Sequence, residues 1–306
     1  MTTMVLLSIA LVGLVFAATM LVAGNNLSAC VGPAVGSRII TRRFGALLGA
    51  TGFSTGLLVQ GATMTSSFGT LLPNATPTLR VEALLVAIIV FFFAFKFHLP
   101  MSLNMSLVGL LAGISLAQNN PANGGFVNQV ALTWIVVPPV AVALAFCLIR
   151  LLNRWLPTNF WHRLQAYKIL LIVMSFSTAY VTGANTLGMI VATGGFDVAS
   201  VIAAVIAVFV GSFFLAEGAI RRVSQEFFVM RYANASATLI TSTILVEIST
   251  FFNIPLSITQ TTSAAVLGTG LSYKTKLVSL KPFLKVVAGW VITPLLSFTI
   301  GFFLIG

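Results

Sequence analysis

The stretch Pro255-Leu256-Ser257-Ile258-Thr259-Gln260-Thr261-Thr262 places small polar residues inside a long apolar region. It has an earlier partner, Pro100-Met101-Ser102-Leu103-Asn104-Met105-Ser106, 155 residues upstream. Two further pairs have nearly the same offset. Gly24-Asn25-Asn26 is echoed by Gly183-Ala184-Asn185 159 residues later, and Trp134 with Pro138 by Trp290 with Pro294 156 residues later. The pattern predicts two related halves, 1–155 and 156–306.

The composition indicates a polytopic membrane protein. The chain is 58% hydrophobic and 7% charged, and apolar stretches of nearly spanning length recur along its 306 residues. A spanning helix needs about twenty apolar residues. The first run, 5–22, is read as a membrane helix rather than a secretory signal, because it lacks a basic leader. We therefore expect an all-α fold in a lipid bilayer.

Several function classes are disfavoured by what the sequence lacks. Cys30 and Cys147 are isolated in apolar surroundings, and His98 and His162 have no partner at metal-ligand spacing. No P-loop, HExxH or GxSxG motif is present. We expect no enzyme activity, no cofactor and no metal site. The net charge of +11 lies at the edges of apolar segments, which excludes a nucleic-acid partner.

Ten apolar segments predict five crossings in each half. They are 4–23, 44–62, 81–97, 101–117 and 128–151, then 166–183, 196–216, 235–252, 256–271 and 284–305. The short glycine-rich stretches 25–37 and 184–194 are expected to be broken or re-entrant pieces at the midplane of the bilayer. The alternative for 101–117 and 256–271 is a pair of re-entrant hairpins, which would change the number of crossings.

The distribution of cations predicts the orientation. Loops rich in Lys and Arg stay in the cytoplasm. Loop 118–127 is uncharged whereas its counterpart 272–285 is basic, and loop 63–79 is uncharged whereas 217–234 is basic. The halves are therefore expected to insert in opposite senses, as inverted repeats typical of secondary transporters. Both termini are expected outside the cytoplasm, in a protein of the cell membrane.

The polar interruptions are candidate binding elements. Freed amides at a half-helix N-terminus carry partial positive charge and bind anions. Hydroxyl and amide side chains stand beside each interruption; the candidate substrate-binding residues are Asn25, Asn26, Ser28, Ser102, Asn104, Asn185, Thr186, Ser257, Thr259, Gln260 and Thr261. The alternative is that such residues only join transmembrane helices. Their pairing across two halves favours an anion site.

Glu247 is the acidic residue that lies inside an apolar segment, 235–252. An ionisable group there is costly and is a functional candidate by default. We consider Glu247 a candidate proton carrier. The alternative is a buried carboxyl group that only pairs two helices.

At these residues the chain resembles the inorganic phosphate transporter (PiT) family. Its Gly-Ala-Asn-Asp signature is matched by Ala23-Gly24-Asn25-Asn26 and by Gly183-Ala184-Asn185-Thr186, and its Pro-Val-Ser-Thr-Thr-His motif by the stretches from Pro100 and Pro255. The resemblance implies two inverted repeats and transport of a tetrahedral oxyanion driven by sodium or protons. The signature aspartates are replaced by Asn26 and Thr186, and the motif histidines by Met105 and Gln260.

These departures leave alternatives open. In the family the signature aspartates are associated with sodium coupling. Their loss here favours proton coupling over sodium coupling. The variant motif from Pro255 is also similar to that of the sulfate permease branch, so phosphate and sulfate stay equal candidates. A passive anion channel and a membrane subunit that does not transport are the competing functions. A homodimer is compatible with the sequence, which has no residue that specifies one.

Overall fold

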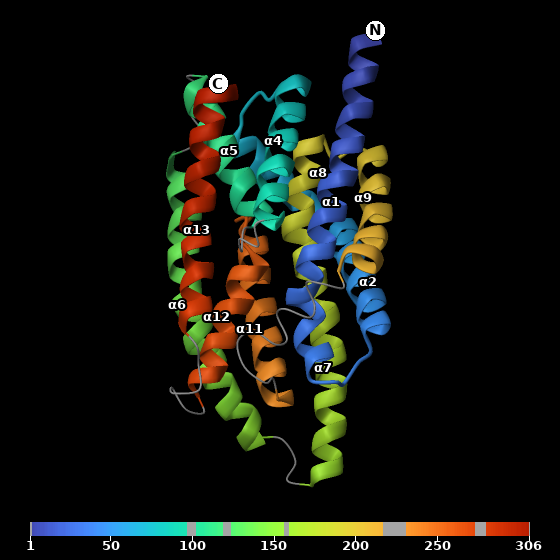
Figure 1. Ribbon diagram of the computed structural model, residues 1–306, viewed down its shortest axis with the longest axis vertical. Helices are drawn as coiled ribbons and strands as arrows, with labels where there is room; N and C mark the ends of the chain where they lie inside the picture. The colour runs from blue at the N-terminus through green and yellow to red at the C-terminus, as the bar shows by residue number, and fades with distance from the viewer. Residues whose placement is uncertain are drawn as a thin grey trace.

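The computed structural model describes residues 2–96, 102–118, 124–155, 159–216, 231–272 and 280–305. Helices account for nearly all of these residues (Figure 1), and the described part contains no strand. The elements are α1 (Thr2–Gly36), α2 (Arg42–Gln60), η1 (Gly61–Thr63), α3 (Met64–Leu71), α4 (Pro77–Lys96), α5 (Leu103–Ala117), α6 (Gly124–Trp155), α7 (Phe160–Thr182), η2 (Gly183–Leu187), α8 (Gly188–Gly194), α9 (Val198–Val210), η3 (Gly211–Leu215), α11 (Tyr232–Phe251), α12 (Ile258–Leu271), α13 (Leu280–Ile300) and η5 (Gly301–Ile305). The all-α expectation is confirmed.

Among the described residues, four helices are long and apolar enough to cross a bilayer by themselves. They are Met4–Gly36, Gly124–Trp155, Phe160–Gly194 and Val198–Leu215. Large apolar side chains such as Leu58, Ile135 and Phe251 are exposed on the outside, whereas many serines and threonines are buried inside. This distribution suits a bilayer, because lipid accepts apolar side chains and the polar groups must find partners within the protein.

The segments 101–117 and 256–271 belong to two hairpins that enter the fold from opposite ends (Figure 1). α4 descends from the upper end and α5 returns to it, whereas α11 rises from the lower end and α12 returns there. α5 has 15 residues and α12 has 14, so each is about 22 Å long, short of the roughly 30 Å of a hydrocarbon core. These lengths favour the re-entrant alternative for the two segments over two further crossings.

The remaining long elements of the two halves correspond in order. In the re-entrant arrangement each hairpin takes the place of two expected crossings, and α1, α2 and α6 of the first half correspond to α7, α9 and α13 of the second. The two termini lie at the same end of the molecule (Figure 1). The turn after α1, the C-terminal end of α6 and the N-terminal end of α7, which carry arginines, lie at the opposite end (Figure 1).

The helices are not interrupted at 25–37 and 184–194, so the expectation of breaks there is wrong. α1 remains helical to Gly36, and the α7 helix continues through the π-helical η2 into α8. The glycines serve close packing instead. A Cβ atom on Gly24 would lie 2.6 Å from the Cβ of Leu215, and one on Gly183 would collide with the backbone carbonyl of Phe53. A continuous helix also keeps its backbone groups bonded inside the bilayer.

Candidate functional site

Asn185 lies within η2, between α7 and α8, and its side chain is fully buried. Its Nδ2 donates to Thr250 Oγ1 and to the carbonyl of Ile254, both at 3.0 Å. Its Oδ1 accepts from the backbone N–H of Leu256 at 2.9 Å and from Asn104 Nδ2 at 3.0 Å. One amide side chain therefore uses both donors and both acceptor positions.

These bonds join the tips of the two hairpins. Thr250 lies near the end of α11, Leu256 just before α12, and Asn104 in the first turn of α5. Asn104 Nδ2 also donates to the Leu256 carbonyl at 3.2 Å, which connects the tips directly. We call Asn104, Asn185, Thr250 and Leu256 the tip cluster. The sequence named Asn104 and Asn185 as candidate binding residues but did not predict that they bond each other, and it did not name Thr250.

The N-termini of α5 and α12 both begin at the tip cluster. Ser102 and Ser257 are their N-cap residues, both have extended backbone, and neither side chain caps its helix. The first-turn amides of a helix have no acceptor within the helix and carry partial positive charge. Two such ends converge here, and the cluster itself contains no carboxylate. The arrangement favours a bound anion.

Asn104 adds one acceptor to this group of donors. Its Nδ2 faces two acceptors, which fixes the orientation of the amide, and its Oδ1 has no hydrogen-bond partner among the described residues. A buried acceptor without a partner costs about 1–3 kcal/mol. It is therefore suited to accept a hydrogen bond from a ligand hydroxyl group or from water.

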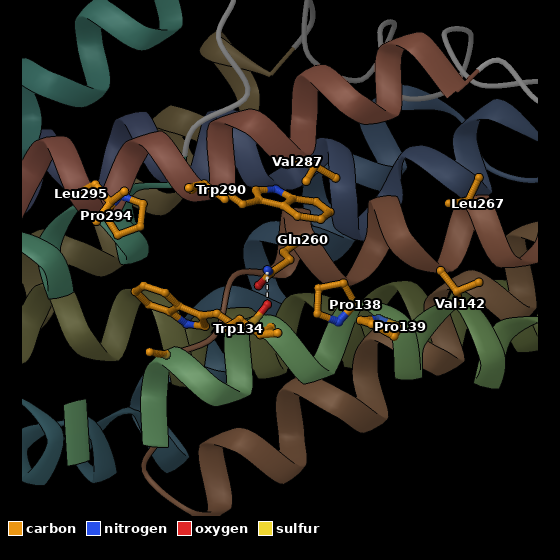
Figure 2. A pocket seen from close by; sticks show the side chains of 13 residues that line it. Trp134, Pro138, Pro139, Val142, Gln260, Leu267, Val287, Trp290, Pro294 and Leu295 are labelled. Atoms are coloured by element: carbon orange, nitrogen blue, oxygen red, sulfur yellow. Dashed lines mark hydrogen bonds between the residues drawn. The ribbon is translucent and has the colours of Figure 1, made fainter. Parts of the chain in front are cut away.

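Gln260 fastens α12 to α6. Pro138 has no backbone N–H, so the carbonyl of Trp134, four residues earlier in α6, loses its helical donor. Gln260 Nε2 donates to this carbonyl at 2.8 Å (Figure 2). The indole Nε1 of Trp134 in turn donates to the carbonyl of Pro255 at 2.9 Å. Gln260 thus has a structural role that a binding prediction alone does not explain.

The α1 residues lie beside this centre. Asn25 Nδ2 donates to Asn26 Oδ1 at 3.3 Å, and Ser28 Oγ donates to the Asn25 carbonyl at 2.7 Å. α1 and α7 run in opposite directions (Figure 1), and Cys30 contacts Thr182 at 3.5 Å. One helical turn further, Asn26 and Thr186 therefore lie at about the same level. These are the two positions where the family signature has aspartate.

The remaining predicted residues of the α12 tip bond locally. Ser257 Oγ and Thr259 Oγ1 are 2.9 Å apart, and Thr261 Oγ1 donates to the carbonyl of Ile258. On the other hairpin, Ser106 and Ser297 join α5 to α13 at 2.7 Å, a contact that the sequence did not reveal. Ser102 and Thr186 are buried. Pro100 and Met101 lie outside the described residues.

Glu247 lies on α11, one turn before Thr250. Gln60 Nε2, at the end of α2, donates to Glu247 Oε1 at 3.1 Å. Glu247 Oε2 is buried and has no hydrogen-bond partner among the described residues. The carboxyl group is therefore linked to the tip cluster through one turn of helix and not by a direct bond.

Comparisons with known proteins agree with this fold. The sequence pattern of the phosphate transporter family matches residues 22–174 and 157–301. A solved structure described as a sodium-dependent phosphate transporter superposes with a TM-score of 0.84 over 98% of both chains, at 15% identity, which shows a common fold. The fold match and the contact between the two hairpins define the class of the protein as a helical membrane transporter. The chain belongs to the phosphate transporter family and is not an enzyme.

Two curated relatives match over most of their length. A "putative phosphate permease" of Methanocaldococcus jannaschii is 25% identical over 284 residues, covering 91% of this chain and 90% of the relative. The sulfate permease CysP of Bacillus subtilis is 26% identical over 304 residues, covering 93% and 83%. The names of the relatives thus include both oxyanions that the sequence left as candidates.

Proposed function

We propose that the chain is a secondary-active permease for a tetrahedral inorganic oxyanion, phosphate or sulfate, and that the anion binds at the tip cluster. The observation that carries this proposal is the convergence of the α5 and α12 N-termini on the Asn104–Asn185 pair. Amides and hydroxyls can replace part of the hydration shell of an oxyanion without a permanent ion pair, which allows release.

The choice between the two anions depends on opposing features of the cluster. Without carboxylates the cluster has few acceptors for a protonated phosphate, which favours sulfate. Asn104 Oδ1 is nevertheless an acceptor with no partner among the described residues, and hydrogenphosphate can donate to it whereas sulfate cannot. The family name favours phosphate and one curated relative is a sulfate permease. Both anions therefore belong in the test.

We propose proton coupling with Glu247 as the proton carrier. A sodium site would favour carboxylate ligands, because hard cations prefer charged oxygen ligands. Asn26 and Thr186 have no carboxylate. Glu247 remains the ionisable group within α11, and it lies one turn from Thr250, which accepts a bond from Asn185. A change in the charge of Glu247 would therefore act one helical turn from the bond between Thr250 and Asn185.

The proposed setting is the cell membrane, with both termini outside and the basic loops in the cytoplasm. The halves 1–155 and 156–306 are proposed as inverted repeats. The matching motifs and the entry of the two hairpins from opposite ends support this division. Lipid is the surrounding partner, and a homodimer is the proposed assembly by analogy with other transporters.

The test is uptake of labelled sulfate and labelled phosphate into proteoliposomes, under an inward pH gradient, an inward sodium gradient, or neither. Accumulation of one anion under the pH gradient alone is the expected result, and it names the substrate. Accumulation that requires sodium would contradict proton coupling. Downhill flux that ignores both gradients would identify a passive anion channel, the alternative favoured by the two missing carboxylates.

A further inference from the structure

A separate cavity of about 540 Å³ lies between α6, α12 and α13. Trp134, Pro138 and Val142 form one wall and Val287, Trp290 and Pro294 the other, with Gln260 between them (Figure 2). The two walls repeat each other, because Trp134 and Pro138 have the same spacing as Trp290 and Pro294. The volume is within the range of ligand pockets, about 300–1,000 Å³.

The lining is unsuited to an oxyanion. Gln260 is the one lining side chain with an amide, its Nε2 is already bonded to the Trp134 carbonyl, and the other walls are aliphatic, aromatic or proline. An oxyanion here would lose its hydration without gaining donors. An apolar ligand loses nothing of this kind, so the cavity selects hydrocarbon.

The rim of the cavity continues into the outer surface of the protein. Ile135 on α6 and Val291 and Leu295 on α13 line it and are 69%, 56% and 61% exposed. Beside them, Leu132 and Ile292 extend the same apolar surface outside the cavity. In a membrane transporter this surface faces the hydrocarbon of the bilayer, so an acyl chain can enter sideways without crossing a polar barrier.

A second copy of the chain is a poorer occupant. In a two-fold dimer the same patch occupies both sides of the interface. A hollow on the axis of such an interface would face its own copy, and empty space in a packed interface forfeits dispersion contacts. A flexible hydrocarbon chain adapts to the shape and fills it.

We propose that this cavity is a binding site for one acyl chain of a membrane phospholipid. The bound chain fills the wedge between α6 and α13 and packs against Gln260, which fastens the α11–α12 hairpin. None of the lining residues belongs to the tip cluster, so the proposal does not depend on which anion is transported.

Tryptophan fluorescence provides a direct test, because two of the four tryptophans line the cavity. A Trp155→Phe/Trp161→Phe variant retains Trp134 and Trp290 as the only fluorophores of their kind. This variant in detergent is titrated with dioleoyl-phosphatidylcholine that is brominated on its acyl chains. We expect saturable quenching, with a loss of about half of the fluorescence and a stoichiometry near one lipid per chain.

The control uses matched substitutions on the same two helices. Val142→Phe/Val291→Phe fills the cavity and should abolish the saturable phase. Val140→Phe/Ile292→Phe places the same rings on exposed neighbouring positions outside the lining and should leave it intact. Quenching that rises linearly with brominated lipid in all variants would show only general contact with lipid. Weak quenching that increases on dilution to monomers would show that a second copy covers the site; either result overturns the proposal.

Discussion

Asn25 and Asn185 occupy equivalent places in the two copies of one motif, yet their surroundings differ. Asn25 lies in a regular α-helix, is partly exposed, and its side chain bonds to the adjacent Asn26. Asn185 lies in a π-helical segment, is fully buried, and makes four bonds to two hairpins. Similar sequence therefore has two different structural roles here. Asn25 makes one local side-chain bond, whereas Asn185 joins two hairpins.

The hairpins differ in the same way. Gln260 of the α12 tip bonds the carbonyl that Pro138 leaves free, whereas its counterpart Met105 has no amide to do so. The α5 helix is instead joined to α13 by Ser106 and Ser297. Among the described residues, the α11–α12 hairpin is thus held by the larger set of directed bonds near its tip.

The largest expected effect comes from Asn185→Ala compared with Asn25→Ala. Asn185→Ala leaves several buried groups without partners, at about 1–3 kcal/mol each, so we expect a loss of roughly 3 kcal/mol or more in stability and no measurable uptake. Asn25→Ala should cost less than about 1 kcal/mol. Thermal unfolding in detergent, together with uptake, measures both. Equal shifts in Tm would remove the distinction between the two asparagines.

Gln260→Met, which copies the residue of the first hairpin, should cost about 1–3 kcal/mol because the Trp134 carbonyl loses its donor. The reciprocal Met105→Gln should bring no comparable gain. In a Pro138→Ala background the helix regains an N–H for that carbonyl, so Gln260→Met should cost less there. Additive losses in this double-mutant cycle would refute the proposed link.

Ser257→Ala and Asn25→Ala should each weaken anion binding about tenfold, equivalent to about 1.4 kcal/mol, if both sides of the centre contact the substrate. Ser8→Ala is the matched control, because Ser8 is exposed and bonds only within its own helix turn. Binding of sulfate and phosphate to purified protein can be followed by calorimetry. Unchanged affinity in both site variants would exclude the paired motifs as the binding site.

Glu247→Gln should change stability least, by less than about 0.5 kcal/mol, since an amide can still accept from Gln60. It should nevertheless stop accumulation driven by a pH gradient while anion exchange continues. No residue of the first hairpin offers a counterpart, because the matching position is Phe92. Normal accumulation in this variant would assign proton coupling to another group.

Much of the fold could be predicted because apolar segments in a bilayer have few alternatives to helix. The sequence also located the hairpin tips, since Ser102 and Ser257 interrupt apolar runs and become N-caps. It failed at 25–37, where glycines were taken for helix breaks. Glycine permits both a break and a close helix contact, and only the neighbour, Leu215 for Gly24, decides between them.

The candidate site was predictable in its composition but not in its connections. Asn104 and Asn185 were both named, yet no sequence pattern indicated that they bond each other across 81 positions. Thr250 was missed because a threonine in an apolar helix commonly bonds its own backbone, as Thr250 also does to Val246. The sequence showed Trp134 and Pro138 as part of a repeat. It did not show that Gln260 donates to the Trp134 carbonyl that Pro138 leaves without a helical donor.

The short hairpins also bear on how the chain is assembled during synthesis. α5 and α12 are too short to span, and α12 carries Thr259, Gln260, Thr261 and Thr262. Neither helix is suited to leave the insertion machinery alone as a stable membrane segment. We expect the traversing helices to enter first, and each hairpin to dock afterwards. Asn185 would then complete the junction late, because its partners Thr250 and Leu256 are synthesised 65 and 71 residues after it.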